Sequence, residues 1–391
     1  MQALPATLAA ALEDIRAAGL YRTRRVVEAF ADPDSSVAVI VEGERRVNFC
    51  ANDYLGLSRH PQVRAAFIEA AQRFGVGSGA SHLVTGHSRE HHALEEELAA
   101  FVGRPRALLF STGYMANLAA ISSLARRGDV VAEDRLNHAS LLDAGLVSAA
   151  RLKRYTHGSA AALDEVLKEQ SCERAIVATD GVFSMDGDIA PLGALAEVCR
   201  ARGAWLIVDD AHGLGVVGPT GRGSLEAAAV GIEDVPVLVG TLGKAFGTFG
   251  AFIAGSADLI EFLIQKARSY IYTTALPPAV AAATRAALRI ASTEDWRRDR
   301  LRVLIERFRT GARALGLALR DSESPIQAVI LGEPGRALEA SAVLAQHGLW
   351  VAAIRPPTVP TGTSRLRITL SAAHSDADVD RLLAALAVIT R

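Results

Sequence analysis

The stretch Val235–Gly250 reads VPVLVGTLGKAFGTFG, and the interpretation of the whole chain starts from it. Its apolar run, Val235–Gly240, is typical of a buried strand, and a glycine-rich loop with Lys244 at its middle follows. Apolar surroundings disfavour the charged form of a lysine, and a neutral amine can attack a carbonyl to form a Schiff base. Taken alone, the loop also fits an ordinary solvated lysine. A Walker phosphate loop is excluded, because Leu238 and Ala245 stand where that motif needs Gly and Ser or Thr.

A second stretch upstream, Ala204–Gly218, reads AWLIVDDAHGLGVVG. The apolar strand Trp205–Val208 runs into Asp209, Asp210 and His212. Open α/β sheets bind their ligands at the carboxyl ends of parallel strands, which is where these polar residues stand. An aspartate there can pair with a protonated ring nitrogen, the partner that pyridoxal phosphate (PLP) requires. The two stretches together favour a PLP enzyme.

The glycines Gly213, Gly215 and Gly218 also fit the spacing of a dinucleotide fingerprint, so an NAD-dependent dehydrogenase is an alternative. That fingerprint should open a helix, whereas Pro219 and further glycines follow here and predict a continuing loop. The dehydrogenase interpretation is therefore the weaker one. A binding protein that kept the fold but lost the cofactor is a third alternative.

Three motifs resemble those of the α-oxoamine synthases: DDAH at 209–212, GTLGKAFG at 240–247 and GVFSMDGD at 181–188. Members of this family are fold-type I PLP enzymes that join an amino acid to an acyl thioester with loss of carbon dioxide. The resemblance covers the chain from about Leu20 to the C-terminus. It implies an α/β fold with a mostly parallel seven-stranded sheet flanked by helices, plus a smaller C-terminal α+β domain. We expect an N-terminal helical and hairpin segment (1–50), a large PLP-binding domain (51–280) and a small domain (281–391).

Composition excludes several other classes of protein. Of 391 residues, 50% are hydrophobic and 22% are charged, so the chain can bury a sizeable core. The formal net charge of −1 argues against a nucleic-acid partner. We find neither a signal peptide nor an apolar run approaching the roughly 20 residues of a membrane span. The three cysteines, Cys50, Cys172 and Cys199, form no CxxC pair and indicate a reducing compartment, so a cytoplasmic protein without membrane association is expected.

The periodicity of the chain predicts its elements. A helix is expected over Ala3–Gly19, a hairpin at Val37–Val41 and Arg45–Phe49, and one long helical stretch over Val280–Leu315. The other strands are expected at Ala107–Phe110, Asp129–Glu133, Arg174–Thr179, Phe252–Ala254, Gln327–Leu331, Trp350–Ile354 and Arg365–Leu370.

Cofactor-binding residues follow partly from chemistry and partly from the resemblance. Gly113 and Tyr114 open a predicted helix, whose free N–H groups and dipole favour an anion such as the cofactor phosphate. The resemblance implies that Lys244 carries PLP and acts as the base, and that Asp209 holds the pyridine nitrogen. It further implies that His138 stacks on the cofactor ring and that Ser184 and His212 contact its phenolic oxygen. Thr241 would also contact the cofactor, and Thr274 would contact the phosphate of the neighbouring subunit's cofactor. The catalytic residues implied are Lys244, His138, Asp209 and His212.

The resemblance also implies substrate contacts. Arg22 would reach the acyl substrate and Asn52 would hydrogen-bond substrate. Arg355 could clasp a carboxylate bidentately, although a surface arginine beside a rigid turn fits equally well. By resemblance Arg355 binds the amino-acid carboxylate and Thr358 lines the site.

The sequence IRPPTVP at 354–360, followed by GTSRLRITL, resembles family members that condense L-alanine with a pimeloyl thioester in biotin biosynthesis. The alternative within the family is condensation of glycine with acetyl-CoA. Whether the acyl donor is linked to CoA or to a carrier protein stays open. The resemblance implies a homodimer with active sites at the interface.

Histidines gather near one predicted helix start. His82 stands where many family members have arginine, which leaves its contact open. The spacing of His87 and His91 could suit a metal, but no third ligand is evident in the sequence. We therefore interpret the segment as an ordinary helix start and predict no metal site.

Overall fold

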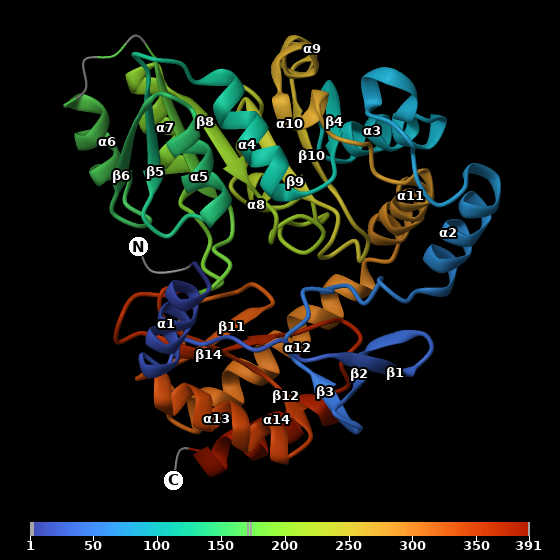
Figure 1. Ribbon diagram of the computed structural model, residues 1–391, viewed down its shortest axis with the longest axis vertical. Helices are drawn as coiled ribbons and strands as arrows, with labels where there is room; N and C mark the ends of the chain where they lie inside the picture. The colour runs from blue at the N-terminus through green and yellow to red at the C-terminus, as the bar shows by residue number, and fades with distance from the viewer. Residues whose placement is uncertain (1–3, 170–171, 173, 390–391) are drawn as a thin grey trace.

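A seven-stranded sheet forms the upper half of the molecule in Figure 1. The structure is a computed structural model that describes residues 4–169, 172 and 174–389. One strand, β10, is antiparallel to both of its neighbours, and the remaining strands run parallel. The predicted mostly parallel seven-stranded sheet is thus confirmed. In spatial order the strands are β4 (Arg106–Phe110), β10 (Ala251–Gly255), β9 (Val237–Thr241), β8 (Trp205–Asp209), β7 (Ala175–Asp180), β5 (Val130–Asp134) and β6 (Arg151–Tyr155).

Helices bury both faces of the sheet. Alternate side chains of each strand point to opposite faces and pack into different apolar clusters. In β8, Ile207 packs into one apolar cluster while Leu206 and Val208 pack into another. The helices on the Ile207 face are α4 (Gly113–Leu124), α5 (Ala139–Val147) and α9 (Ala257–Lys266), and those on the opposite face are α6 (Ala160–Lys168) and α7 (Leu192–Arg202).

Two smaller sheets lie in the lower half of the molecule (Figure 1). The predicted hairpin is present, and its strand β3 pairs in parallel with β12 from the C-terminal part of the chain. The four-stranded sheet contains β1 (Val27–Asp32), β2 (Ser35–Val41), β3 (Glu44–Asn48) and β12 (Leu349–Trp350). The three-stranded antiparallel sheet contains β11 (Ile326–Gly332), β14 (Ser364–Thr369) and β13 (Ala352–Ile354).

Two expected elements are each divided in the structure. The helical stretch 280–315 is two helices, α11 (Pro278–Thr293) and α12 (Trp296–Ala314), because Glu294 leaves the helical conformation with φ −104° and ψ 68°. The expected strand 350–354 is divided between β12 and β13, which belong to different sheets. Both predictions of a single element were therefore wrong.

The remaining helical elements lie outside these sheets. They are α1 (Leu4–Ala17), α2 (Pro61–Phe74), the π-helical turn η1 (His82–Gly86), α3 (Arg89–Phe101), α8 (Ser224–Ala227), α10 (Arg268–Ile271), α13 (Pro334–Gln346) and α14 (Asp376–Ile389). Among the described residues, we find no helix that combines the length and the apolar character needed to cross a membrane.

The parallel strands end at one common edge of the large sheet. Asp180 at the end of β7 is paired in register with Asp209 at the end of β8, and β9 ends beside them at Thr241. Because the carboxyl ends of parallel strands meet at one edge, the loops that follow them converge. The candidate active site lies there.

Candidate active site

Lys244 lies in the loop between β9 and β10, with its Nζ 3.0 Å from Nε2 of His212. Burial lowers the pKa of Lys244 to about 8, although the carboxylates of Asp209 and Asp180 oppose the shift. The amine therefore loses its proton far more readily than an ordinary lysine, and a minor fraction of it is neutral near pH 7. This is the state that the sequence interpretation required of a nucleophilic lysine.

A chain of hydrogen bonds leads away from the lysine. His212 Nδ1 lies 2.7 Å from the hydroxyl of Tyr54, which donates to Oδ1 of Asn52 at 3.1 Å. Since Tyr54 donates its only proton to Asn52, its oxygen accepts from His212 Nδ1, and His212 Nε2 is left to accept from Lys244. Burial raises the pKa of Tyr54 to about 12, and burial followed by the charge of Lys244 holds the pKa of His212 well below its usual value. Every hydrogen bond in the network is thus donated in the same direction, from Lys244 through His212 and Tyr54 to Asn52.

Asp209 is held by two donors. Asn117 Nδ2 donates to its Oδ2 at 2.6 Å, and the backbone N–H of Ala211 donates to its Oδ1 at 3.0 Å. Asn117 in turn donates to Ser140 Oγ at 2.8 Å. Burial, reinforced by the charge of Asp209, raises the pKa of neighbouring Asp180 well above its usual value. Asp180 is thus harder to ionise than an ordinary aspartate, and it lies beside a carboxylate that is fixed in orientation.

His138 stands at the N-cap of α5. Its Nδ1 lies 2.7 Å from Ser140 Oγ, and its backbone N–H donates to Asp180 at 2.8 Å. Burial lowers the pKa of His138, while the charge of Asp209 opposes that shift. The ring is therefore favoured in its neutral form, which suits stacking on a flat aromatic ligand.

The start of α4 offers a place for an anion. Thr112 is the N-cap, and its side chain accepts from the backbone N–H of Met115 at 3.2 Å. Gly113 and Tyr114 occupy the first two helical positions, whose N–H groups have no partner within the helix. Ser111, just before the cap, donates to the backbone oxygen of Thr274 at 3.4 Å. This geometry agrees with the phosphate position expected from the sequence.

Arg367 is a residue of the site that the sequence interpretation missed. Its Nε donates to the backbone oxygen of Ser184 at 2.6 Å, and its Nη2 donates to Asn52 Oδ1 at 3.2 Å. Arg367 also influences the pKa of both Lys244 and His212. Its strand was predicted, but Arg365 and Arg367 lie on the same face of that strand, and the motif RLRITL does not say which of them reaches Asn52.

The other predicted contacts fall in different places. Thr241 ends β9, and its hydroxyl donates to the backbone oxygen of Gly250 at 3.1 Å. Arg22 donates to Thr358 Oγ1 at 3.2 Å, and Arg355 donates to the backbone oxygen of Gly19. These last three predicted residues, Arg22, Thr358 and Arg355, line one pocket of about 560 Å³ between residues 19–25 and residues 350–358.

The loop at 213–223 lacks the feature that a dinucleotide fingerprint requires. Gly215 and Gly218 adopt positive φ, and the chain stays in turns until Ser224 begins the single-turn helix α8. No helix starts at the glycines. The dehydrogenase interpretation therefore has no structural support.

The sequence matches the family described as "Aminotransferase class I and II" over residues 44–386. This chain belongs to that family. Among curated relatives, the 8-amino-7-oxononanoate synthase of Methylococcus capsulatus is 62% identical over 379 residues, which span 97% of each chain.

Solved structures agree with this family assignment. A high-resolution structure of serine palmitoyltransferase (SPT) with PLP has a TM-score of 0.93 at 33% identity, covering 99% of this chain and 98% of that one. The 8-amino-7-oxononanoate synthase of Francisella tularensis has a TM-score of 0.78 at 33% identity, covering 88% of this chain and 97% of that one. Shape alone does not separate these activities within the family, whereas sequence identity favours one of them.

The chemistry of the site fits the cofactor of this family. It offers a buried amine for a carbonyl, an oriented carboxylate for a ring nitrogen, a neutral imidazole for a ring face and a helix start for a phosphate. Together these groups suit a phosphorylated pyridine aldehyde.

Proposed function

We propose that this protein acts as an 8-amino-7-oxononanoate synthase, which condenses L-alanine with a pimeloyl thioester and releases carbon dioxide and free thiol. The observation that carries the proposal is the 62% identity over 97% of the chain to a curated synthase of that name. The site adds the donors and the buried lysine that such chemistry needs.

PLP would be held by Lys244, Asp209 and His138, with its phosphate at Gly113 and Tyr114 and its phenolic oxygen near His212 and Ser184. When bound, PLP withdraws electrons from the α-carbon of an attached amino acid, which makes loss of a proton or of carbon dioxide feasible. Thr241 and Thr274 are proposed as further cofactor contacts.

Lys244 is proposed as the base that removes the α-proton of L-alanine. Its pKa, lowered to about 8, lets Nζ lose its proton more readily than an ordinary lysine, and the hydrogen bond to His212 Nε2 fixes the position of the amine. Tyr54 holds His212 in the tautomer that accepts this hydrogen bond. The chain thus positions one amine for proton transfer.

The amino-acid carboxylate has two proposed partners. Arg355 is the one the sequence resemblance favours. Arg367 is favoured by geometry, because its guanidinium contacts Asn52 and its charge affects Lys244. We place Asn52 beside the same carboxylate and assign Arg22 and Thr358 to the acyl substrate, since they line the 560 Å³ pocket.

We further propose a cytoplasmic homodimer with active sites at the interface. All three cysteines are free thiols, which agrees with a reducing compartment. In sedimentation, we expect a mass about twice the 41.2 kDa of the chain. A fully active monomer would contradict the dimer proposal.

Turnover with matched substrate pairs tests the proposed activity. We expect product from L-alanine with pimeloyl-CoA, and little from glycine with acetyl-CoA or L-serine with palmitoyl-CoA. Borohydride reduction followed by peptide mapping should place a pyridoxyl group on Lys244. Exclusive use of glycine with acetyl-CoA would refute the substrate assignment, whereas a colourless protein that PLP does not label would refute the cofactor.

A further inference from the structure

A pocket of about 400 Å³ lies beside α3, which packs on the Ala107 and Leu109 face of β4, opposite the face that α4 covers. Its lining is unusually rich in groups that ligate metals: His82 from η1, His87 from the following turn, and His92 and Glu95 from α3. The sequence spacing suggested only His87 and His91 as ligands. The site proposed above uses none of these residues.

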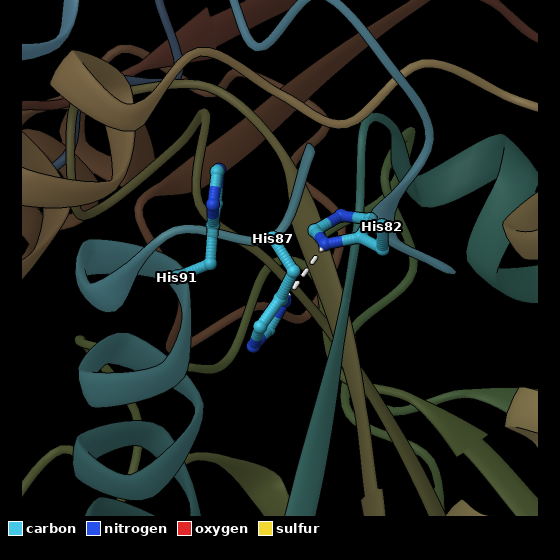
Figure 2. Close-up of side chains that lie close together, drawn as sticks. All are labelled: His82, His87 and His91. Atoms are coloured by element: carbon cyan, nitrogen blue, oxygen red, sulfur yellow. Dashed lines mark hydrogen bonds between the residues drawn. The ribbon is translucent and has the colours of Figure 1, made fainter. Parts of the chain in front are cut away.

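His91 is not available as a ligand. Its Nε2 donates to the backbone oxygen of Leu276 at 2.7 Å, and its Nδ1 accepts from the backbone N–H of Ser88 at 2.9 Å. Both ring nitrogens therefore already have protein partners, and the second one forms the capping box of α3. Figure 2 shows the hydrogen bond that joins His82 to His87; the His91 ring lies beside both, with its centroid 5.1 Å from that of His82, but the partners of its two nitrogens are elsewhere.

His87 has one ring nitrogen held and the other facing the pocket. Its Nδ1 lies 3.0 Å from Nδ1 of His82, whose ring stacks on Tyr270 with centroids 5.1 Å apart. When His87 donates this hydrogen bond, the lone pair is on its Nε2. Metal-bound histidines in proteins are commonly oriented in this way, by a partner of the nitrogen that does not bind the metal.

Glu95 faces that lone pair from α3. One carboxylate oxygen accepts from the backbone N–H of Leu109 at 3.0 Å, and the other lies 4.0 Å from His87 Nε2. The side chain is only 14% exposed. The nearby Arg106 is engaged by Glu261 at 3.2 Å. A buried carboxylate is costly without a partner charge, so a cation between Glu95 and His87 would be stabilised.

We propose that His87, His92 and Glu95 form a binding site for a divalent transition-metal ion of the zinc class, with His82 orienting His87. Donor atoms of the three ligands lie within 4.8 Å of one another. Zinc bonds of about 2.0–2.2 Å need donor atoms about 3.3 Å apart, so the three side chains must move closer together when the ion binds. His92 allows this, because its side chain is 67% exposed, and to reach the ion its Nε2 has only to leave the exposed Glu96, whose Oε1 lies 3.6 Å away.

Such an ion would connect the turn before α3 to the body of that helix. Its remaining coordination positions would face the pocket, where water or a small anion can complete the shell. Because the ion binds the folded chain, the thermal midpoint should rise with its concentration. The inference is independent of the proposed synthase activity.

Binding of Zn²⁺ alone to the untagged, chelator-treated protein tests the proposal, with affinity measured by competition against a chromogenic chelator. We expect one ion per chain, and binding at least tenfold weaker in His92→Gln, His87→Gln and Glu95→Gln. The matched control is His347→Gln, which removes an exposed imidazole at the end of α13 and should bind like wild type. Circular dichroism would confirm that each variant is folded, and His92→Gln alters only an exposed side chain.

X-ray absorption of the loaded protein separates this site from others. Nitrogen and oxygen ligands alone support the proposal, whereas sulfur ligands would place the ion at a cysteine and overturn it. Zn²⁺ binding that is unchanged in the His87→Gln/His92→Gln double variant would also overturn it. So would the absence of micromolar binding by the wild-type chain.

Discussion

Burial of Lys244 in the candidate site has an energetic consequence that can be measured. A lysine that is held away from water in the folded protein, but solvated in the unfolded chain, binds its proton less tightly when folded. Its pKa falls from 10.5 to about 8. Because the folded pKa is the lower one, the unfolded state binds more protons between these values, and stability rises with pH in this window.

The first prediction concerns this pH dependence in the protein without PLP. Relative to Lys244→Met, the wild-type free energy of unfolding should rise by about 3 kcal/mol as pH increases from below 8 to above 10.5, since each pKa unit is worth about 1.4 kcal/mol. Urea unfolding of both proteins across this range measures the difference. A difference that does not change with pH would mean that Lys244 is solvated.

The second prediction compares two neighbouring aspartates. Asp209→Asn should lower turnover by about 100-fold or more, because the amide cannot keep the pyridine nitrogen of the cofactor protonated. A loss of this size is typical when a group that controls a proton in the reaction is removed. Asp210→Asn is the matched control, because the Asp210 carboxylate accepts the Ser224 N–H at 2.7 Å, a role that an amide oxygen can keep. Its turnover should stay within about tenfold of wild type. Equal losses in both variants would refute the special role of Asp209.

Single residues were predictable where chemistry and local motif coincide. Lys244, Asp209 and His212 stand directly after apolar strands, so their place at the sheet edge followed from the pattern. Tyr54 and Arg367 were missed because they reach His212 and Asn52 from segments far away in the chain. Spacing along the sequence contains no information on such contacts.

At the scale of elements, the lysine loop is held by a close approach between two backbones. Gly247 has φ +66°, and a Cβ at this position would lie 2.3 Å from the backbone nitrogen of Ser58. Because the obstacle is backbone, it cannot move aside cheaply. The loop therefore requires glycine here, both for conformation and for space.

The third prediction follows from this contact. Gly247→Ala should destabilise the protein by about 2 kcal/mol or more and reduce PLP loading, because it displaces the loop that carries Lys244. Gly193→Ala, in the first turn of α7, is the control: a Cβ added there would have no atom within 4 Å, and the change should stabilise by about 0.5 kcal/mol. Thermal unfolding measures both. A Gly247→Ala protein as stable as wild type would contradict the argument.

Elements were predictable where burial imposes a clear pattern. The central strands, such as β8, are apolar runs because both of their faces are covered. The edge strand β6 reads RLKRY, and we did not predict it because most of its side chains are exposed and basic. The break between α11 and α12 was missed because helical periodicity continues on both sides of Glu294.

At the scale of the whole molecule, we propose the division 1–50, 51–280 and 281–391. The parallel pairing of β3 with β12 joins the first part to the third, a link that no local pattern announces. The 560 Å³ pocket lies along this junction. Movement between the first and third parts would therefore change the shape of the proposed acyl site.

The fourth prediction tests whether the active site is shared between two chains. Thr274 is proposed to contact the phosphate of the partner's cofactor, so Lys244→Ala and Thr274→Ala should complement each other. After unfolding and refolding as a mixture, random pairing makes half of the dimers mixed, and each mixed dimer has one intact site. Activity at limiting PLP should recover to about a quarter of wild type, above the sum of the two separate variants.

The same mixture distinguishes a shared site from a self-contained one. If Thr274 serves its own chain, as its contact with Ser111 near the start of α4 also permits, each mixed dimer contains one site without Lys244 and one without Thr274. Activity then equals the average of the separate variants, and the proposed contact across the interface is wrong. Refolded wild type, carried through the same steps, sets the scale for both outcomes.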